Sequence, residues 1–129
     1  MDIITNNNIN EENIYVSVYG TLRPGFGNNR LLLTSTYMGT GNTANKYTLR
    51  ASGIPFVSEE PLHNIVVDVY KVNKDTLERL DELEGHPDWY CRKLIPIKLE
   101  NTTIDAWLYF NDKYPELPII ESGDYKKNN

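Results

Sequence analysis

One helical pattern in an otherwise strand-rich chain limits the folds open to these 129 residues. We expect this helix over residues 74–84, where leucines recur at helical spacing (Leu77, Leu80 and Leu83). Asn73 or Asp75 can cap its N-terminus, and Gly85 is typical of the position just past a helix end. Elsewhere the nine tyrosines and many β-branched residues favour strands. An α+β fold follows, with one helix inserted among mostly antiparallel strands in a small barrel-like domain.

The chain length suits a single domain, which we place at 14–125, between a flexible N-terminal arm (1–13) and a polar tail (126–129). We expect 64–72 to be the longest strand and a central one, because its apolar residues lie on both faces. The other predicted strands are 14–19, 36–41, 43–51 and the hairpin of 89–99 with 102–110.

Four further stretches connect or flank these strands. We expect one or two helical turns over 28–33, with an Asn as the cap. The 54–57 piece contains a proline and is predicted to be an edge strand or a loop. A solvated break is expected at 59–61, and we expect 119–125 to dock back onto the domain.

The net charge and the cysteine content limit the classes of partner and the cellular compartment that we expect. A net charge of −5 argues against nucleic acid or an acidic membrane as a partner, since both attract a basic surface. No apolar run approaches the length of a membrane span, and the N-terminus lacks a signal pattern. Cys91 is the only cysteine, which excludes an internal disulfide framework and fits a reducing compartment. We therefore expect a cytoplasmic protein.

The stretch 14–25 joins a buried strand to a loop that can bind an anion. Apolar residues alternate along one face of the strand (Ile14, Val16 and Val18). We expect Gly20 to adopt a backbone conformation that a residue with a Cβ would resist. Such a loop can direct several backbone N–H groups at one small anion or carbonyl oxygen. It is not a phosphate-binding P-loop, because Phe26 and Gly27 stand where Lys and Ser or Thr are required.

Glu84 breaks two local rules, which makes it the leading candidate for chemistry. It lies seven residues after Leu77 and four after Leu80, so it belongs to the buried side of the helix. It also lies in the last turn, where the helix dipole disfavours a negative charge. A carboxyl group against an apolar wall has a raised pKa and can act as a general acid/base near neutral pH. Alternatively, the last turn frays and Glu84 points to water.

We expect the other acidic residues to have structural rather than catalytic roles. On the helix, we expect Glu78, Asp81 and Glu82 on the outer face as solvating charges. Asp68 interrupts the apolar run of its strand, and it either lies near a solvated strand end or pairs with a cation.

No metal, cofactor or nucleophile site is predicted. His63 and His86 are isolated, with no Cys or His at ligand spacing, and no catalytic triad is present. Cys91 lies on the apolar side of its strand, where a core role is more typical than that of a nucleophile.

Four blocks of sequence, in order, resemble the γ-glutamylcyclotransferase-like family. The run Tyr19-Gly20-Thr21-Leu22 is similar to the Tyr-Gly-(Ser/Thr)-Leu signature of that family. The other blocks are Val69-Tyr70, then Leu80-Asp81-Glu82-Leu83-Glu84-Gly85 with Tyr90 and Arg92, and the closing Ser122-Gly123-Asp124-Tyr125. Size and shape resemble the small γ-glutamylamine cyclotransferase branch.

The resemblance implies a small mixed barrel with a cavity at one end. It implies that Glu84 is the catalytic acid/base and that a small-molecule γ-glutamyl compound is the substrate, with 5-oxoproline as the product. The substrate-gripping residues would be the signature loop and an aromatic residue near the cavity (Tyr19, Gly20, Thr21, Leu22 and Tyr90). No metal or cofactor is implied.

The sequence departs from the family in its central strand. Members often carry Gly-Glu two positions before the tyrosine, where this chain has Val67-Asp68. The added bulk and the shorter acid are expected to alter the cavity and therefore the substrate. Two alternatives accompany the cyclotransferase hypothesis: a non-catalytic binding or regulatory module with the same pocket, and removal of a γ-glutamyl protecting group from a biosynthetic intermediate.

Overall fold

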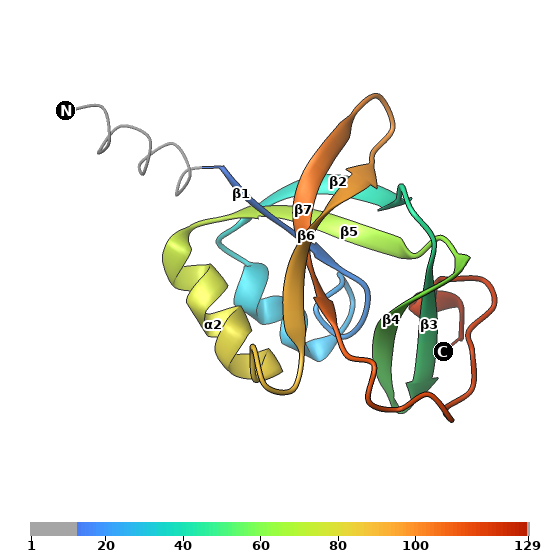
Figure 1. Cartoon of the computed structure of the whole chain (residues 1–129). Coiled ribbons are helices and arrows are strands. Elements are labelled where there is room, and N and C mark those ends of the chain that lie inside the picture. The colour runs from blue at the N-terminus through green and yellow to red at the C-terminus, as the bar shows by residue number, and fades with distance from the viewer. Residues whose placement is uncertain (1–12, 129) are drawn as a thin grey trace.

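The computed structural model describes residues 13–128, so the arm predicted over 1–13 lies outside it except for its last residue. Five strands close into a barrel in the order β1-β5-β2-β6-β7, and β3 and β4 form a separate two-stranded sheet (Figure 1). Neighbours in the barrel are antiparallel except β1 and β7, which are parallel. The strands are β1 (Ile14–Val18), β2 (Thr36–Thr43), β3 (Tyr47–Ser52), β4 (Ile54–His63), β5 (Val66–Val72), β6 (Cys91–Lys98) and β7 (Thr103–Phe110). The predicted mixed, mostly antiparallel barrel with one main helix is confirmed.

Helix α2 (Lys74–Glu84) has the predicted bounds. Its N-terminus is capped by Asn73, whose side chain accepts a 2.8 Å hydrogen bond from the Thr76 N–H. Gly85 ends the helix with a left-handed φ of 67°. The prediction that Leu83 joins the buried side is wrong, because six residues after Leu77 correspond to a position about 120° around the helix. Leu83 is exposed at the helix end.

Strand β1 is buried on both faces because it separates two apolar clusters. Val16 and Val18 pack with Leu77 and Leu80 of α2. Tyr19, just past the strand, belongs instead to the cluster that strands β5, β6 and β7 form with β3 and β4. Figure 1 shows α2 and the short helix η1 (Gly27–Leu32) on one side of the barrel, away from β3 and β4. The loop that follows β1 is therefore anchored on both sides.

Strand β4 confirms one prediction and corrects another. The proline-containing 54–57 piece is an edge strand, one of the two alternatives predicted for it, but the strand continues through the expected break at 59–61. Both prolines are tolerated because β4 pairs only with β3, so its other edge needs no ladder hydrogen bonds. With ten residues it also exceeds the seven of β5, which is central as predicted but not the longest strand.

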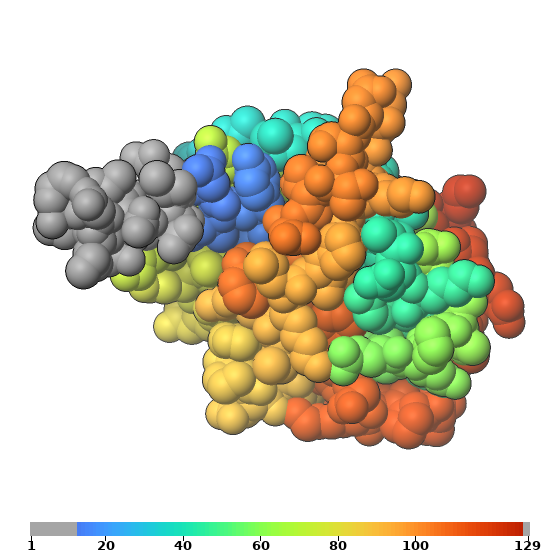
Figure 2. Space-filling view, turned by 45° about the horizontal axis from the view of Figure 1, so that its top comes forward, coloured from blue at the N-terminus to red at the C-terminus, as the bar shows by residue number. Residues whose placement is uncertain are grey.

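The chain end and the hairpin follow the sequence expectations. Ile120 N–H donates to the Leu49 carbonyl at 2.8 Å, and Val66 N–H donates to the Gly123 carbonyl at 2.8 Å, so 119–125 docks onto the domain. The start of the expected tail forms the short helix η2 (Tyr125–Asn128). The tip of the β6–β7 hairpin protrudes in orange at the upper right of Figure 2. Within residues 13–128, no helix is long and apolar enough to cross a membrane.

The helical turn predicted at 28–33 is the 3₁₀ helix η1, but its capping prediction is wrong. Phe26 occupies the N-cap position and makes no side-chain cap bond. Asn28 and Asn29 instead turn back to the loop after β1. Asn28 Nδ2 donates to Thr21 Oγ1 at 2.9 Å, and Asn29 Nδ2 donates to the Leu22 carbonyl at 2.8 Å. The asparagines thus brace the loop rather than the helix.

Candidate active site

A cavity of about 280 Å³ lies where β1 and α2 both end. All six predicted site residues line it (Tyr19, Gly20, Thr21, Leu22, Glu84 and Tyr90). Sequence reasoning did not identify the other lining residues, which are Ser17, Val18, Asn28, Ile54, Pro55, Leu83, Trp89 and Tyr109. Half of them lie within two residues of a predicted site residue in the sequence, and the other half (Asn28, Ile54, Pro55 and Tyr109) come from segments that only the fold brings to the cavity.

Glu84 lines this cavity from the last turn of α2. Burial raises the pKa of its carboxyl group to about 7. Its side chain makes no hydrogen bond or ion pair with any residue in 13–128. The helix end is held, because Tyr90 N–H donates to the Glu84 carbonyl at 3.1 Å. The alternative in which a frayed last turn releases Glu84 to water is therefore not the arrangement found.

Tyrosines form the polar part of the cavity wall, but their hydroxyl groups are already committed. Tyr19 Oη donates to the Tyr109 carbonyl at 2.7 Å, and Tyr90 Oη donates to the Pro55 carbonyl at 2.8 Å. Burial, with a smaller contribution from the nearby Glu84 charge, raises the pKa of Tyr19 and Tyr90 well above the ordinary value. Burial and the hydrogen bond to Asp81 do the same for the pKa of Tyr109. Of the titratable residues lining the cavity, Glu84 alone can exchange a proton near neutral pH.

The loop after β1 folds into a tight turn at the cavity wall. Arg23 N–H donates to the Gly20 carbonyl at 3.0 Å. Gly20 does not have a positive φ, which corrects the expected reason for a glycine here. A Cβ at this position would lie 2.5 Å from Pro55 Cγ, so close approach of β4 requires the glycine. The N–H groups of Thr21 and Leu22, two residues that line the cavity, have no acceptor among residues 13–128.

A buried ionic network anchors the same loop from behind. Arg23 is 3% exposed; its Nε donates to Asp68 Oδ2 and its Nη1 to Asp124 Oδ1, both at 2.7 Å. The second Asp68 oxygen accepts from Tyr37 Oη at 2.9 Å and Thr40 Oγ1 at 2.5 Å. Pairing with a cation, one of the two expectations for Asp68, is confirmed.

Asp81 corrects the expectation that it is a solvating charge. Arg92 donates to both of its carboxylate oxygens, at 2.8 and 3.0 Å, and Tyr109 Oη donates to it at 2.7 Å. Although burial raises the pKa of Asp81, these hydrogen bonds hold it below its ordinary value. Arg92 is thus occupied by Asp81 and not by Glu84. Glu78 and Glu82 are exposed, as expected.

The remaining candidate groups lie elsewhere. Cys91 is a partly exposed free thiol at the start of β6 and does not line the cavity. Within residues 13–128, no group of three or more His, Cys, Asp or Glu side chains could hold a metal ion.

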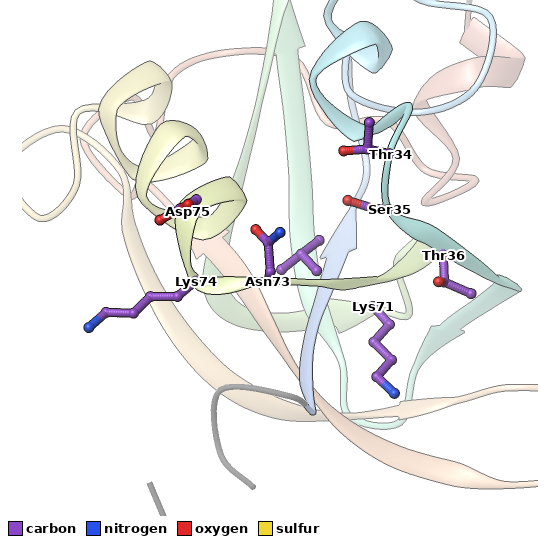
Figure 3. Close-up of a pocket in the computed structure, with 8 residues that line it drawn as sticks. Thr34, Ser35, Thr36, Lys71, Asn73, Lys74 and Asp75 are labelled. Atoms are coloured by element: carbon purple, nitrogen blue, oxygen red, sulfur yellow. The ribbon is translucent and has the colours of Figure 1, made fainter. Parts of the chain in front are cut away.

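A larger hollow, about 730 Å³, lies at the opposite end of α2. Its lining is mostly polar and includes Lys71, Lys74 and Asp75. In Figure 3 the side chains of Lys71 and Lys74 extend away from each other, so their charges do not converge on a ligand. None of the six predicted site residues lines this hollow, and all six line the Glu84 cavity.

Comparison with known proteins places the chain in a family. Residues 16–127 match the family described as gamma-glutamyl cyclotransferase, AIG2-like. A Methanocaldococcus jannaschii protein, named provisionally as a gamma-glutamylcyclotransferase, is 49% identical over 117 residues, which is 87% of this chain and 95% of that protein. The gamma-glutamylaminecyclotransferase of Bos taurus is 32% identical over 125 residues, covering 84% of this chain and 74% of the relative.

A solved structure shows the same fold. The crystal structure of an AIG2-like protein from Mus musculus superposes with a TM-score of 0.78 at 26% identity, covering 85% of this chain and 87% of the mouse chain. This chain therefore belongs to the gamma-glutamyl cyclotransferase, AIG2-like family.

Proposed function

We propose that this protein is a γ-glutamyl cyclotransferase, which converts a γ-glutamyl amine or γ-glutamyl peptide into 5-oxoproline and the free amine. The observation that carries the proposal is the unpaired Glu84 carboxyl group, with a pKa of about 7, in the same cavity as the Gly20 turn. Family membership supports the same activity. A cytoplasmic location agrees with the single cysteine.

The reaction needs an acid/base and a polar cradle but no covalent enzyme intermediate. The α-amino nitrogen of the substrate attacks its own γ-carbonyl carbon, forming the ring C–N bond, and the original amide C–N bond then breaks. Because nucleophile and carbonyl belong to one molecule, proximity supplies much of the acceleration. Glu84 takes the proton that the attacking nitrogen loses and returns it to the leaving nitrogen, so no net proton is consumed.

The other lining residues hold the substrate. The N–H groups of Thr21 and Leu22 are suited to bind the α-carboxylate or the oxyanion that develops on the γ-carbonyl oxygen. Tyr19 and Tyr90 shape the cavity with their rings, because their hydroxyl groups already donate to backbone carbonyls. The Arg23 network keeps the loop in place.

The product identifies the reaction. We expect the purified protein to release 5-oxoproline and amine from γ-glutamyl amides and dipeptides, measured by chromatography. An N-acetyl-γ-glutamyl amide is the matched control substrate, since its blocked nitrogen cannot cyclise. Release of glutamate instead of 5-oxoproline would show a hydrolase. Binding without turnover of any substrate would favour the non-catalytic module.

A further inference from the structure

The opening of the Glu84 cavity is lined by apolar side chains that the fold leaves in contact with solvent. Ile54 is 48% exposed, Leu83 42% and Trp89 39%, and all three line this cavity. Single exposed apolar residues are common on protein surfaces. These three come from separate segments, namely the start of β4, the end of α2 and the loop before β6, and meet at one opening. We refer to them as the apolar rim.

The rim is held in place. Trp89 N–H donates to the Gly85 carbonyl at 2.9 Å. The Trp89 ring packs edge-on against Tyr90 at 5.0 Å and Phe56 at 6.1 Å. Because the indole is already fixed, a ligand in the opening can pack against it with little further loss of side-chain entropy.

The cavity offers no partner to a charged leaving group apart from the catalytic acid itself. Among its fourteen lining residues, Glu84 is the only one with a charged side chain. Arg92, which lies eight residues after Glu84 in the sequence, does not line the cavity and is paired with Asp81. A charged tail on the leaving amine would lose hydration at the rim without an ion pair to replace it.

We propose that the apolar rim binds the leaving amine, and that the preferred substrates are γ-glutamyl amides of apolar amines, with alkyl or aromatic side chains. This inference rests on the proposed cyclotransferase function. All substrates share the γ-glutamyl head, whose γ-carbonyl must reach Glu84, so the amine is the part that varies. Leu83 directly precedes Glu84 in α2 and lines the same cavity, so an amine released from the substrate's γ-carbonyl carbon beside Glu84 would lie against the rim.

The test is the dependence of kcat/KM on the leaving amine, measured as 5-oxoproline release. The series comprises γ-glutamyl methylamide, propylamide and hexylamide, together with the 5-aminopentylamide, which has the length of the hexylamide but ends in an ammonium group. We expect kcat/KM to rise about two- to fourfold per added methylene and the hexylamide to exceed its charged counterpart by at least about tenfold. The gain should appear in KM, because the rim contacts the amine equally in the ground and transition states.

Variants assign the preference to the rim. Ile54→Ser and Leu83→Ser should each lower the hexylamide-to-methylamide ratio of kcat/KM about three- to tenfold, and a ratio is unaffected by the fraction of folded enzyme. Leu94→Ser, at a residue 53% exposed but outside the cavity, is the matched control and should leave the ratio unchanged.

Three results would overturn the inference. Turnover that is independent of chain length, or that favours the 5-aminopentylamide, refutes the apolar preference and leaves the cyclotransferase function intact. A length dependence that persists in both rim variants refutes the assignment to the rim. No 5-oxoproline from any substrate refutes the proposed function itself, and the inference with it.

Discussion

Asp81 and Glu84 lie less than one turn apart on α2 in opposite electrostatic settings. Asp81 receives two hydrogen bonds from Arg92 and one from Tyr109, which hold its pKa below the ordinary value despite burial. Glu84 has no such partner among residues 13–128, and burial raises its pKa to about 7. The difference separates an acid that joins helix to barrel from an acid that can take and return a proton.

The Gly20 turn also lies between a paired acid and an unpaired one. Asp68 is buried behind the turn and bonded to Arg23, whereas Glu84 faces the cavity in front of it. The paired acid fixes the position of the loop. Under the proposed function, the unpaired acid exchanges protons with the substrate that the loop binds. Replacing one acid or the other should therefore give different kinds of defect.

The largest expected effect is on catalysis. Glu84→Gln should lower kcat by about 10²–10⁴, because the lone acid/base is lost while the shape of the side chain is kept. Glu82→Gln, on the exposed face two residues earlier, is the matched control and should keep full activity. Steady-state 5-oxoproline kinetics measure both. Equal activity of Glu84→Gln and wild type would remove the catalytic role.

Removing the partner of a buried charge should mainly affect stability. Asp68→Asn removes the more deeply buried of the two carboxylates that pair with the Arg23 guanidinium, leaving only Asp124, and should lower the free energy of unfolding by about 3–5 kcal/mol. Urea denaturation followed by circular dichroism provides the measurement. Asp81→Asn, whose side chain is 20% exposed, should cost less. Equal losses of unfolding free energy in Asp68→Asn and Asp81→Asn would contradict this dependence on burial.

The raised pKa of Glu84 makes folding depend on pH in a defined direction. The folded state binds the proton more tightly than the unfolded chain, so stability falls as pH rises from about 4.5 to about 7. The shift corresponds to a loss on the order of 3 kcal/mol, which should be absent from Glu84→Gln. Unfolding curves of both proteins at pH 4 and pH 8 measure it. Parallel pH dependence in the two proteins would show that Glu84 is not the group responsible.

The smallest expected change tests the contact that closes the cavity wall. Gly20→Ala places a methyl group 2.5 Å from Pro55 Cγ, and the required shift should cost about 1–3 kcal/mol of stability. Activity should fall as well, since the turn and β4 are pushed apart. Gly27→Ala is a suitable control, because a Cβ there meets no atom within 4 Å. Unchanged stability of Gly20→Ala would mean that the turn and β4 do not touch.

Local signals were enough to predict much of this molecule. The bounds of α2, its Asn73 cap and the β6–β7 hairpin all follow from short-range patterns. Glu84 could be singled out because helical periodicity depends only on neighbouring residues. The prediction that the loop after β1 lines the site came from the family resemblance.

Two errors were local, the placement of Leu83 on the buried side of α2 and the Asn cap of η1. The others concern contacts between distant segments. Asp81 was assigned to solvent because a helical pattern contains no information about Arg92 and Tyr109, which strands β6 and β7 bring beside it. Nothing in the sequence relates Gly20 to Pro55, although their contact decides why the glycine is needed. A break was predicted at 59–61 because nothing in the local sequence shows that the strand beginning at Ile54 continues to His63 beside β3.

The pH dependence of kcat/KM tests the central claim that Glu84 is an unpaired acid poised to move protons. For wild type, kcat/KM should rise with pH through a limb near 7 as the Glu84 carboxyl group ionises and becomes a base. The substrate amino group titrates equally with every variant, so the limb near 7 should be missing from the residual activity of Glu84→Gln. The same limb in both proteins, or a wild-type profile that is flat between pH 5 and pH 8, would contradict the account.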